Sequence, residues 1–169
     1  MKTVFKTLFI LLCFLPLSSF GQQVKLGNIN TNDLLSSMPE IVAAKAYLDS
    51  MSKKAQATLK SLEDEYRGKI DDYQKNSSSW SDAEKRSKET EIQQLQERAT
   101  QYQTDAKDEL DKKQDEKMTP IITKVKDAIK QVAKEGGYTY IFDTASGVVL
   151  YAVDTEDVTP QVKRKLNLK

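Results

Sequence analysis

The sequence predicts an α+β fold that is mostly α: a long antiparallel helical hairpin, a coiled-coil arm, projecting from a small β-rich base. Two apolar stripes with helical spacing predict the helices of the arm, and a serine-rich break between them predicts its tip. Short β-rich segments at both ends of the chain predict the base. A charged content of 30% with only six glycines favours long helices over a compact α/β core.

The first 21 residues have the organisation of a secretory signal peptide, with cleavage expected after Gly21. Lys2 and Lys6 precede an apolar run, which is followed by small residues near the cleavage point. The apolar run is too short to span a bilayer. Lipidation of Cys13 is an alternative, although Leu12 stands where a lipoprotein signal needs a small residue. We therefore expect an exported protein.

The composition of the mature chain excludes several kinds of chemistry. The protein has no histidine, and its one cysteine is expected to leave with the signal peptide. The mature chain therefore has no thiol nucleophile, no imidazole base and no His or Cys ligand for zinc. It must also fold without disulfides. After cleavage, 24 basic residues face 25 acidic ones, a balance that argues against binding of nucleic acid through its phosphates.

The mature chain opens with a segment that belongs to the predicted base. Residues 24–30 alternate apolar and polar side chains, which is typical of a half-buried strand. The next residues predict a turn and a short helix that stops before Pro39. We assign residues 22–40 to the base, together with residues 119–169.

From Pro39 the spacing of apolar residues becomes helical. Apolar or small residues recur in steps of three and four from Ile41 to Tyr73, and proline suits the first turn of a helix. About 36 residues at 1.5 Å each make a helix of roughly 54 Å. A core built from this chain could not cover that length, so the helix is expected to project and to pair as a coiled coil.

A second long helix is predicted to run back along the first. Ser81 is the expected N-cap, with Glu84 as its capping-box partner, and a glycine pair at 136–137 is the expected end. The arm then comprises residues 41–118, with its tip near residues 76–81. Pro120 lies inside the second helix and predicts a kink where the arm meets the base.

The last zone of the chain returns to strand character. Residues 138–143 and 148–153 are β-rich and separated by a short turn, which predicts a β-hairpin. Thr159 and Pro160 then predict the N-cap and first residue of a final short helix. A three-stranded sheet with apolar side chains on both faces is marginal alone, so copies of the base are expected to pack together. The candidates for this oligomer interface are Ile29, Ile141, Val149 and Tyr151.

Three stretches of the mature chain resemble the periplasmic chaperone family variously called Skp or OmpH-like. They comprise residues 26–31 with 34–40, residues 137–143 after the second long helix, and residues 149–152 with 157–162 and 166–168. The resemblance implies a homotrimer whose bases join and whose arms surround a cavity. In that cavity, family members hold unfolded outer-membrane β-barrel proteins in the periplasm without using ATP. Well-known members are strongly basic, so the near-neutral charge of this chain weakens an electrostatic capture mechanism.

Candidate contact residues for such clients lie along the arm. Aromatic rings and methionines suit transient, low-specificity contacts, and the candidates are Met51, Tyr66, Tyr73, Trp80 and Tyr102. Since most of them fall on the apolar stripes, sealing of the two helices is the plainer interpretation. Basic residues near the tip could touch an acidic client or, weakly, a membrane surface, and these are Lys85, Arg86 and Lys88. Acidic neighbours make a solvated, self-compensating face the plainer interpretation there.

The sequence predicts no enzyme, metal site or cofactor. Adjacent carboxylates such as Asp71 and Asp72 point in different directions on a helix, and no phosphate loop or nucleophile elbow occurs. Alternatives to the chaperone remain. The arm could be a spacer or docking adaptor for one specific envelope partner, or the protein could bind nucleic acid or lipopolysaccharide, which its neutral charge disfavours.

Overall fold

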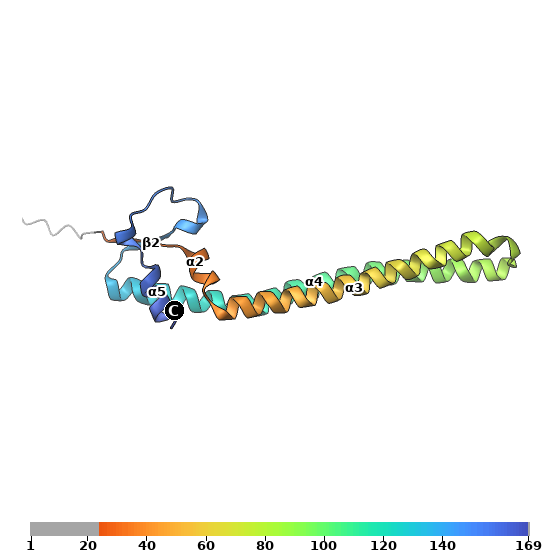
Figure 1. The fold of residues 1–169 in the computed structure, drawn as a ribbon, viewed down its shortest axis with the longest axis horizontal. Coiled ribbons are helices and arrows are strands. Elements are labelled where there is room, and N and C mark those ends of the chain that lie inside the picture. Colours follow the sequence, from red (N-terminus) through yellow and green to blue (C-terminus); the bar gives the residue numbers. More distant parts are fainter. Residues whose placement is uncertain (1–23, 169) are drawn as a thin grey trace, which may run out of the picture.

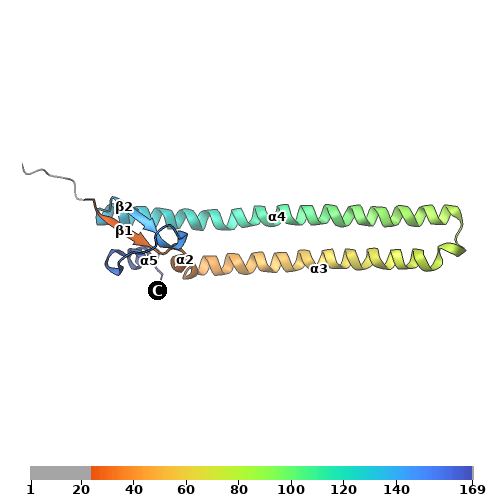
Figure 2. The same cartoon turned by 90° about the horizontal axis from the view of Figure 1, so that it is seen from above.

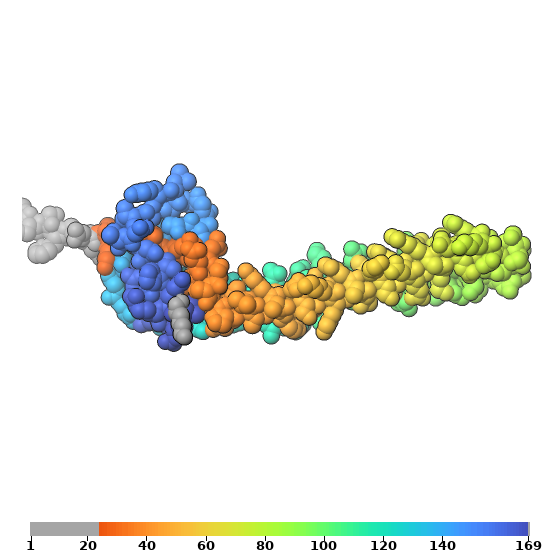
Figure 3. Space-filling view, viewed as in Figure 1, coloured from red at the N-terminus to blue at the C-terminus, as the bar shows by residue number. Residues whose placement is uncertain are grey.

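The computed structural model describes residues 24–168, which form a slender arm attached to a bulkier base (Figures 1 and 3). The predicted signal peptide and Cys13 lie outside the described residues. The elements follow in the order β1 (Leu26–Ile29), α2 (Thr31–Ser36), α3 (Pro39–Asn76), η1 (Ser77–Ser79), α4 (Asp82–Gly136), β2 (Tyr140–Asp143), η2 (Thr144–Ser146), η3 (Asp154–Glu156) and α5 (Thr159–Lys165), where η marks a 3₁₀ turn.

The two long helices form the predicted antiparallel hairpin, side by side along its whole length (Figure 2). Residues of both apolar stripes are half-buried or buried along the seam, while most of the other residues of the arm are exposed. Three ion pairs cross from α3 to α4: Glu40 with Lys124 at 2.6 Å, Glu65 with Arg98 at 3.2 Å, and Lys69 with Glu91 at 2.8 Å. The mostly α fold with a projecting arm is therefore confirmed.

The start and end of α4 follow local sequence signals. The Ser81 hydroxyl accepts a hydrogen bond from the Glu84 N–H, and the Glu84 carboxylate accepts one from the Ser81 N–H, which completes the predicted capping box. At the other end, Gly137 adopts a φ of 66°, a left-handed conformation that glycine reaches without strain. The helix continues unbroken through Pro120, and Figure 2 shows no sharp bend along α4.

The predicted β-hairpin in the base is wrong. β2 pairs with β1, in parallel, with Leu26 opposite Tyr140 and Ile29 opposite Asp143. Residues 148–153 form no strand, so the sheet has two strands, β1 and β2, where three were predicted. Hydrogen bonds within η2 explain the difference: the Asp143 side chain and carbonyl accept bonds from the Ala145 N–H and the Ser146 hydroxyl, and so fold the chain away from the β2 edge.

The core of the base is assembled from nearly every element around the sheet. Its fully buried members come from β1, α2, the ends of α3 and α5, and the residues between them: Ile29, Leu34, Met38, Ile41, Val158 and Val162. The last turns of α4 add Val125, Ala128 and Val132. The predicted final helix is present, although its N-cap is Val158 rather than Thr159.

The Asp143 side chain links the end of β2 to the start of α2 through hydrogen bonds. Its carboxylate accepts hydrogen bonds from the Thr31 hydroxyl at 2.6 Å, the Thr31 N–H at 3.3 Å and the Ala145 N–H at 2.9 Å. Partial burial raises the pKa of Asp143, but these hydrogen bonds outweigh it and hold the pKa below its ordinary value. The carboxylate is therefore expected to stabilise the base in its ionised form.

Replacing Asp143 by alanine is expected to lower the free energy of unfolding by about 1–3 kcal/mol at neutral pH, because three hydrogen-bond donors lose their acceptor. Since the folded state lowers this pKa, the stabilisation is present above about pH 4, the value for an unfolded aspartate, and is lost as the pH falls through the folded value. Denaturant titrations at pH 7 and pH 3 measure this, with exposed Asp154→Ala as control. An equal loss at both pH values would contradict the role of the charge.

Candidate functional surfaces

The predicted contact residues of the arm lie mainly on its seam. Met51, Tyr66, Tyr73 and Tyr102 are half-buried, so each has one face against the opposite helix and another toward solvent. This placement agrees with packing and leaves part of each side chain accessible.

Trp80 packs against a neighbour at the tip of the arm. Its ring meets the Tyr73 ring edge-on, with the centroids 5.6 Å apart, and the Tyr73 hydroxyl donates a hydrogen bond to the Glu89 carboxylate. That hydrogen bond raises the pKa of Tyr73 above its ordinary value. The tip thus contains an aromatic pair joined to α4, and Trp80 keeps part of its surface exposed.

The predicted basic residues of the tip lie among carboxylates. Lys88 is 3.6 Å from Glu91, which also pairs with Lys69, and Lys85 is 4.0 Å from Asp82. Hydrogen bonding and attraction from Lys69, with a further contribution from Lys88, hold the pKa of Glu91 below its ordinary value. Arg86 is exposed. The charges of this region largely compensate one another, which leaves no strong single-sign field at the tip.

The base exposes a group of large apolar side chains. Val148, Leu150 and Tyr151 are between 83% and 95% exposed, and the rings of Tyr140 and Phe142 stack on the surface with centroids 6.2 Å apart. A chain that folds alone seldom leaves such side chains in water together. We call the group the apolar rim; its members are Val24, Leu26, Tyr140, Phe142, Val148, Leu150, Tyr151 and Val153.

The four interface candidates from the sequence fall in different environments. Tyr151 belongs to the apolar rim, Val149 is half-buried, and Ile141 is half-buried against the core. Ile29 is only 2% exposed because it fills the core of its own base, so its side chain offers no surface to a second copy. Sequence reasoning missed Tyr140 and Phe142 as rim residues, although strand alternation places both on the face opposite Ile141.

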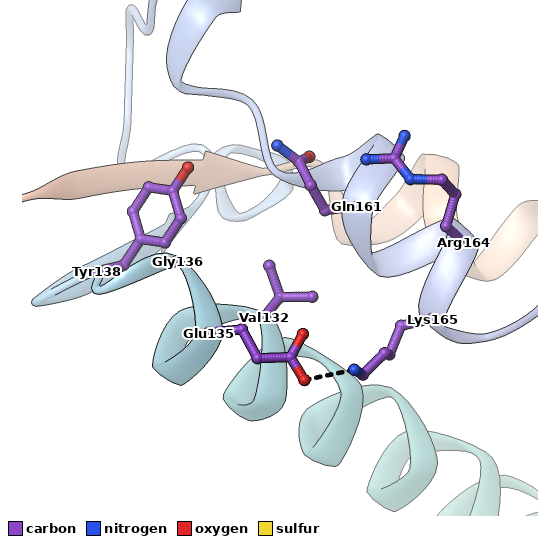
Figure 4. Close-up of a pocket in the computed structure, with 7 residues that line it drawn as sticks. All are labelled: Val132, Glu135, Gly136, Tyr138, Gln161, Arg164 and Lys165. Atoms are coloured by element: carbon purple, nitrogen blue, oxygen red, sulfur yellow. Dashed lines mark hydrogen bonds and ion pairs between the residues drawn. The ribbon is translucent and has the colours of Figure 1, made fainter.

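A small hollow lies where the last turn of α4 meets α5 (Figure 4). Its volume is about 470 Å³, and Val132 contributes to its lining. Glu135 pairs with Lys165 at 2.5 Å across it, so its acidic group is already engaged. The Lys25 ammonium lies 4.2 Å from the centre of the Tyr138 ring and donates a hydrogen bond to the Gly136 carbonyl at 2.7 Å. These contacts join the residue before β1 to the end of α4, and α4 to α5, so we regard the hollow as structural.

Other kinds of site find no support among residues 24–168. This part of the chain holds no cluster of three or more acidic, histidine or cysteine side chains placed to share a metal ion. Every helix in it is too short or too polar to cross a bilayer. The surfaces that remain are the half-buried seam of the arm, its aromatic tip and the apolar rim of the base.

Comparisons with known proteins agree along nearly the whole described chain. A family model described as "Outer membrane protein (OmpH-like)" matches residues 25–166. The chain is 24% identical over 153 residues to the chaperone protein Skp of Yersinia enterocolitica, covering 90% of this chain and 92% of that protein. It is 22% identical over 146 residues to Skp of Pectobacterium atrosepticum, covering 84% and 85%.

The fold also matches a solved structure. The crystal structure of an OmpH-like protein from Caulobacter crescentus superposes with a TM-score of 0.71 at 12% identity, covering 85% of this chain and 84% of that one. At this identity the match supports the arm-and-base architecture, independently of the sequence relatives.

Proposed function

Because the chain belongs to the OmpH-like outer membrane protein family, we propose that it is a periplasmic, ATP-independent holdase chaperone for unfolded outer-membrane β-barrel proteins. The observation that carries the proposal is the similarity to proteins named Skp chaperones over 84–90% of the chain. The signal-peptide pattern at the start of the sequence supports export to the periplasm.

The shape and surface of the protein suit this role. A long arm with half-buried aromatic and apolar side chains offers many weak contacts spread over a large area, rather than one deep pocket. Many weak contacts within one assembly can hold a flexible client, because each contact raises the effective concentration of the client for the others. Since basic and acidic residues nearly balance, apolar contact and confinement carry more of the binding than charge does.

We further propose that the protein works as a homo-oligomer, a trimer, joined through its bases. The apolar rim supports this, because burying its side chains against other copies removes them from water. β2 has one edge on β1, and β1 makes one bridge, between Asn28 and Asp157, on its other side. Val148, Leu150, Tyr151 and Val153 are exposed, and residues 148–153 belong to no strand of their own copy, so this segment is available to pair with a neighbouring copy. The arms, residues 41–118, would then surround a shared cavity.

A holdase assay tests the proposal. An unfolded outer-membrane β-barrel diluted from urea into buffer aggregates, and the mature protein is expected to suppress its light scattering at near-equimolar ratios without ATP. A reduced, unfolded soluble α-helical protein serves as a second client and measures selectivity. Aggregation of the barrel at the rate seen without chaperone would contradict the proposed function.

A further inference from the structure

The middle of α4 carries a band of uncharged polar side chains. Residues 93–104, which we call the amide band, contain five glutamines and two threonines, and Glu97 and Arg98 are their only charged residues. The neighbouring segments of the same helix differ sharply, since seven of ten residues are charged at 82–91 and ten of thirteen at 105–117. The band is therefore a local feature of α4 and does not follow from the composition of the arm.

The opposite helix has no such band at the same level of the arm. The cross-helix pairs Lys69–Glu91 and Arg98–Glu65 place residues 58–69 of α3 beside the amide band. Six of those twelve residues are charged. At this level the arm thus has a charged side on α3 and an amide-rich side on α4.

A surface hollow of about 520 Å³ lies on the amide-rich side, lined by Gln94, Glu97, Arg98, Gln101, Tyr102 and Asp105. The Arg98 guanidinium reaches across the seam to Glu65, so its charge is engaged with α3. The Gln101 side chain donates to Asp105 at 2.7 Å, which leaves its own oxygen as an acceptor. Glu97 accepts a hydrogen bond from the Gln93 side chain at 3.0 Å, so each charged residue of the lining has a partner within the arm. The hollow therefore presents two amides, Gln94 and Gln101, beside one face of the half-buried Tyr102.

Amide side chains match the backbone of an unfolded polypeptide. Each amide both donates and accepts hydrogen bonds, as does each unpaired peptide group, whereas carboxylates only accept and ammonium groups only donate. Because the charges of Glu97, Arg98 and Asp105 are each paired within the arm, this surface selects clients only weakly by their charge. Twelve helical residues span about 18 Å, the length of an extended segment of about five or six residues.

We propose that the amide band is the surface of the arm that contacts extended, unpaired polypeptide. Gln94 and Gln101 hydrogen-bond to the backbone of the segment, and the exposed face of Tyr102 receives an apolar side chain. The inference rests on the proposed chaperone function and assigns an orientation to the arm. At this level α4 faces the client, and the charged side of α3 faces solvent.

Paired substitutions test the band without changing the net charge of the protein. Gln94→Glu with Gln101→Lys replaces both amides by charges, each with an oppositely charged neighbour four residues on, Arg98 and Asp105. The control is Gln56→Glu with Gln74→Lys, the same exchange at exposed positions of α3. Loss of two hydrogen bonds and introduction of charge are expected to weaken binding of a urea-diluted β-barrel roughly tenfold. The control should bind like the wild type.

A second variant, Gln94→Ala with Gln101→Ala, removes the amides without adding charge and favours helix. It should bind several-fold more weakly than the wild type, and circular dichroism of all variants checks that helicity and melting are unchanged. Wild-type affinity in both band variants, or equal weakening in the α3 control, would overturn the assignment while leaving the holdase function in place. Failure of the wild-type protein itself to hold the barrel would instead contradict the proposed function.

Discussion

Replacing Leu150 and Tyr151 together by aspartate is expected to dissociate the proposed oligomer into monomers. The two side chains are 95% and 83% exposed in the single chain, more than the other members of the apolar rim apart from Val148. Burial of each between copies contributes on the order of 1.5–3 kcal/mol, and a carboxylate in their place would have to be desolvated. Dissociation constants should therefore rise by a factor of more than about 100.

Light scattering coupled to size exclusion measures the mass of the wild type and the double variant directly. Val42→Asp is the matched control, since Val42 is a large apolar residue that is 60% exposed on α3 and outside the rim. The control should keep the wild-type mass. If the double variant kept the wild-type mass, residues 148–153 would not form the interface. A wild-type monomer at micromolar concentration would contradict assembly as a whole.

Replacing Leu34 by alanine is expected to unfold the base while the arm stays helical. Leu34 is fully buried, and truncating a buried leucine to alanine costs about 2–5 kcal/mol. α2 has six residues, too few for a stable helix by itself, so its position depends on this packing. The arm keeps its own seam and its cross-helix ion pairs.

Hydrogen exchange separates the two parts of the molecule. In the Leu34→Ala protein, amides of β1 and β2 should exchange much faster than in the wild type, while those in the middle of α4 should be little changed. Leu59→Ala, which truncates a half-buried leucine of the seam, should show the converse pattern. Equal acceleration in both regions would mean that the arm and base unfold as one unit.

Sequence reasoning succeeded where the deciding interactions are local. The capping box at Ser81, the glycine end at Gly137 and the helical spacing of apolar residues all act within a few positions of the chain, and each was present as predicted. The partner of β2 is not local: it is β1, near the start of the described residues. Alternation identifies a strand but carries no information about which strand lies beside it.

The functional surfaces were harder to predict than the fold. Aromatic residues of the arm could be found from their type and spacing, but their half-buried state follows from the opposite helix. Ile29 was a candidate for the oligomer interface because the alternation of apolar and polar residues placed it on one face of a strand. It lies in the core instead, in one cluster with buried residues of α2, α3 and α5. The contact between Trp80 and Tyr73 also escaped prediction, because the η1 turn between them sets their distance.

The parallel pairing of β1 with β2 has a consequence for how the chain folds. Paired residues such as Leu26 and Tyr140 are 114 positions apart, so the base closes only when its last segments are available. Contacts between residues so far apart in the sequence form slowly. The hairpin of α3 and α4 can instead form turn by turn from its tip, where the residues in contact are close in the sequence. If the chain is exported with its N-terminus first, β1 crosses the membrane before β2 and α5 and cannot pair until they follow. We therefore expect closure of the base to limit the folding rate, and subunits to associate only after the whole chain has emerged.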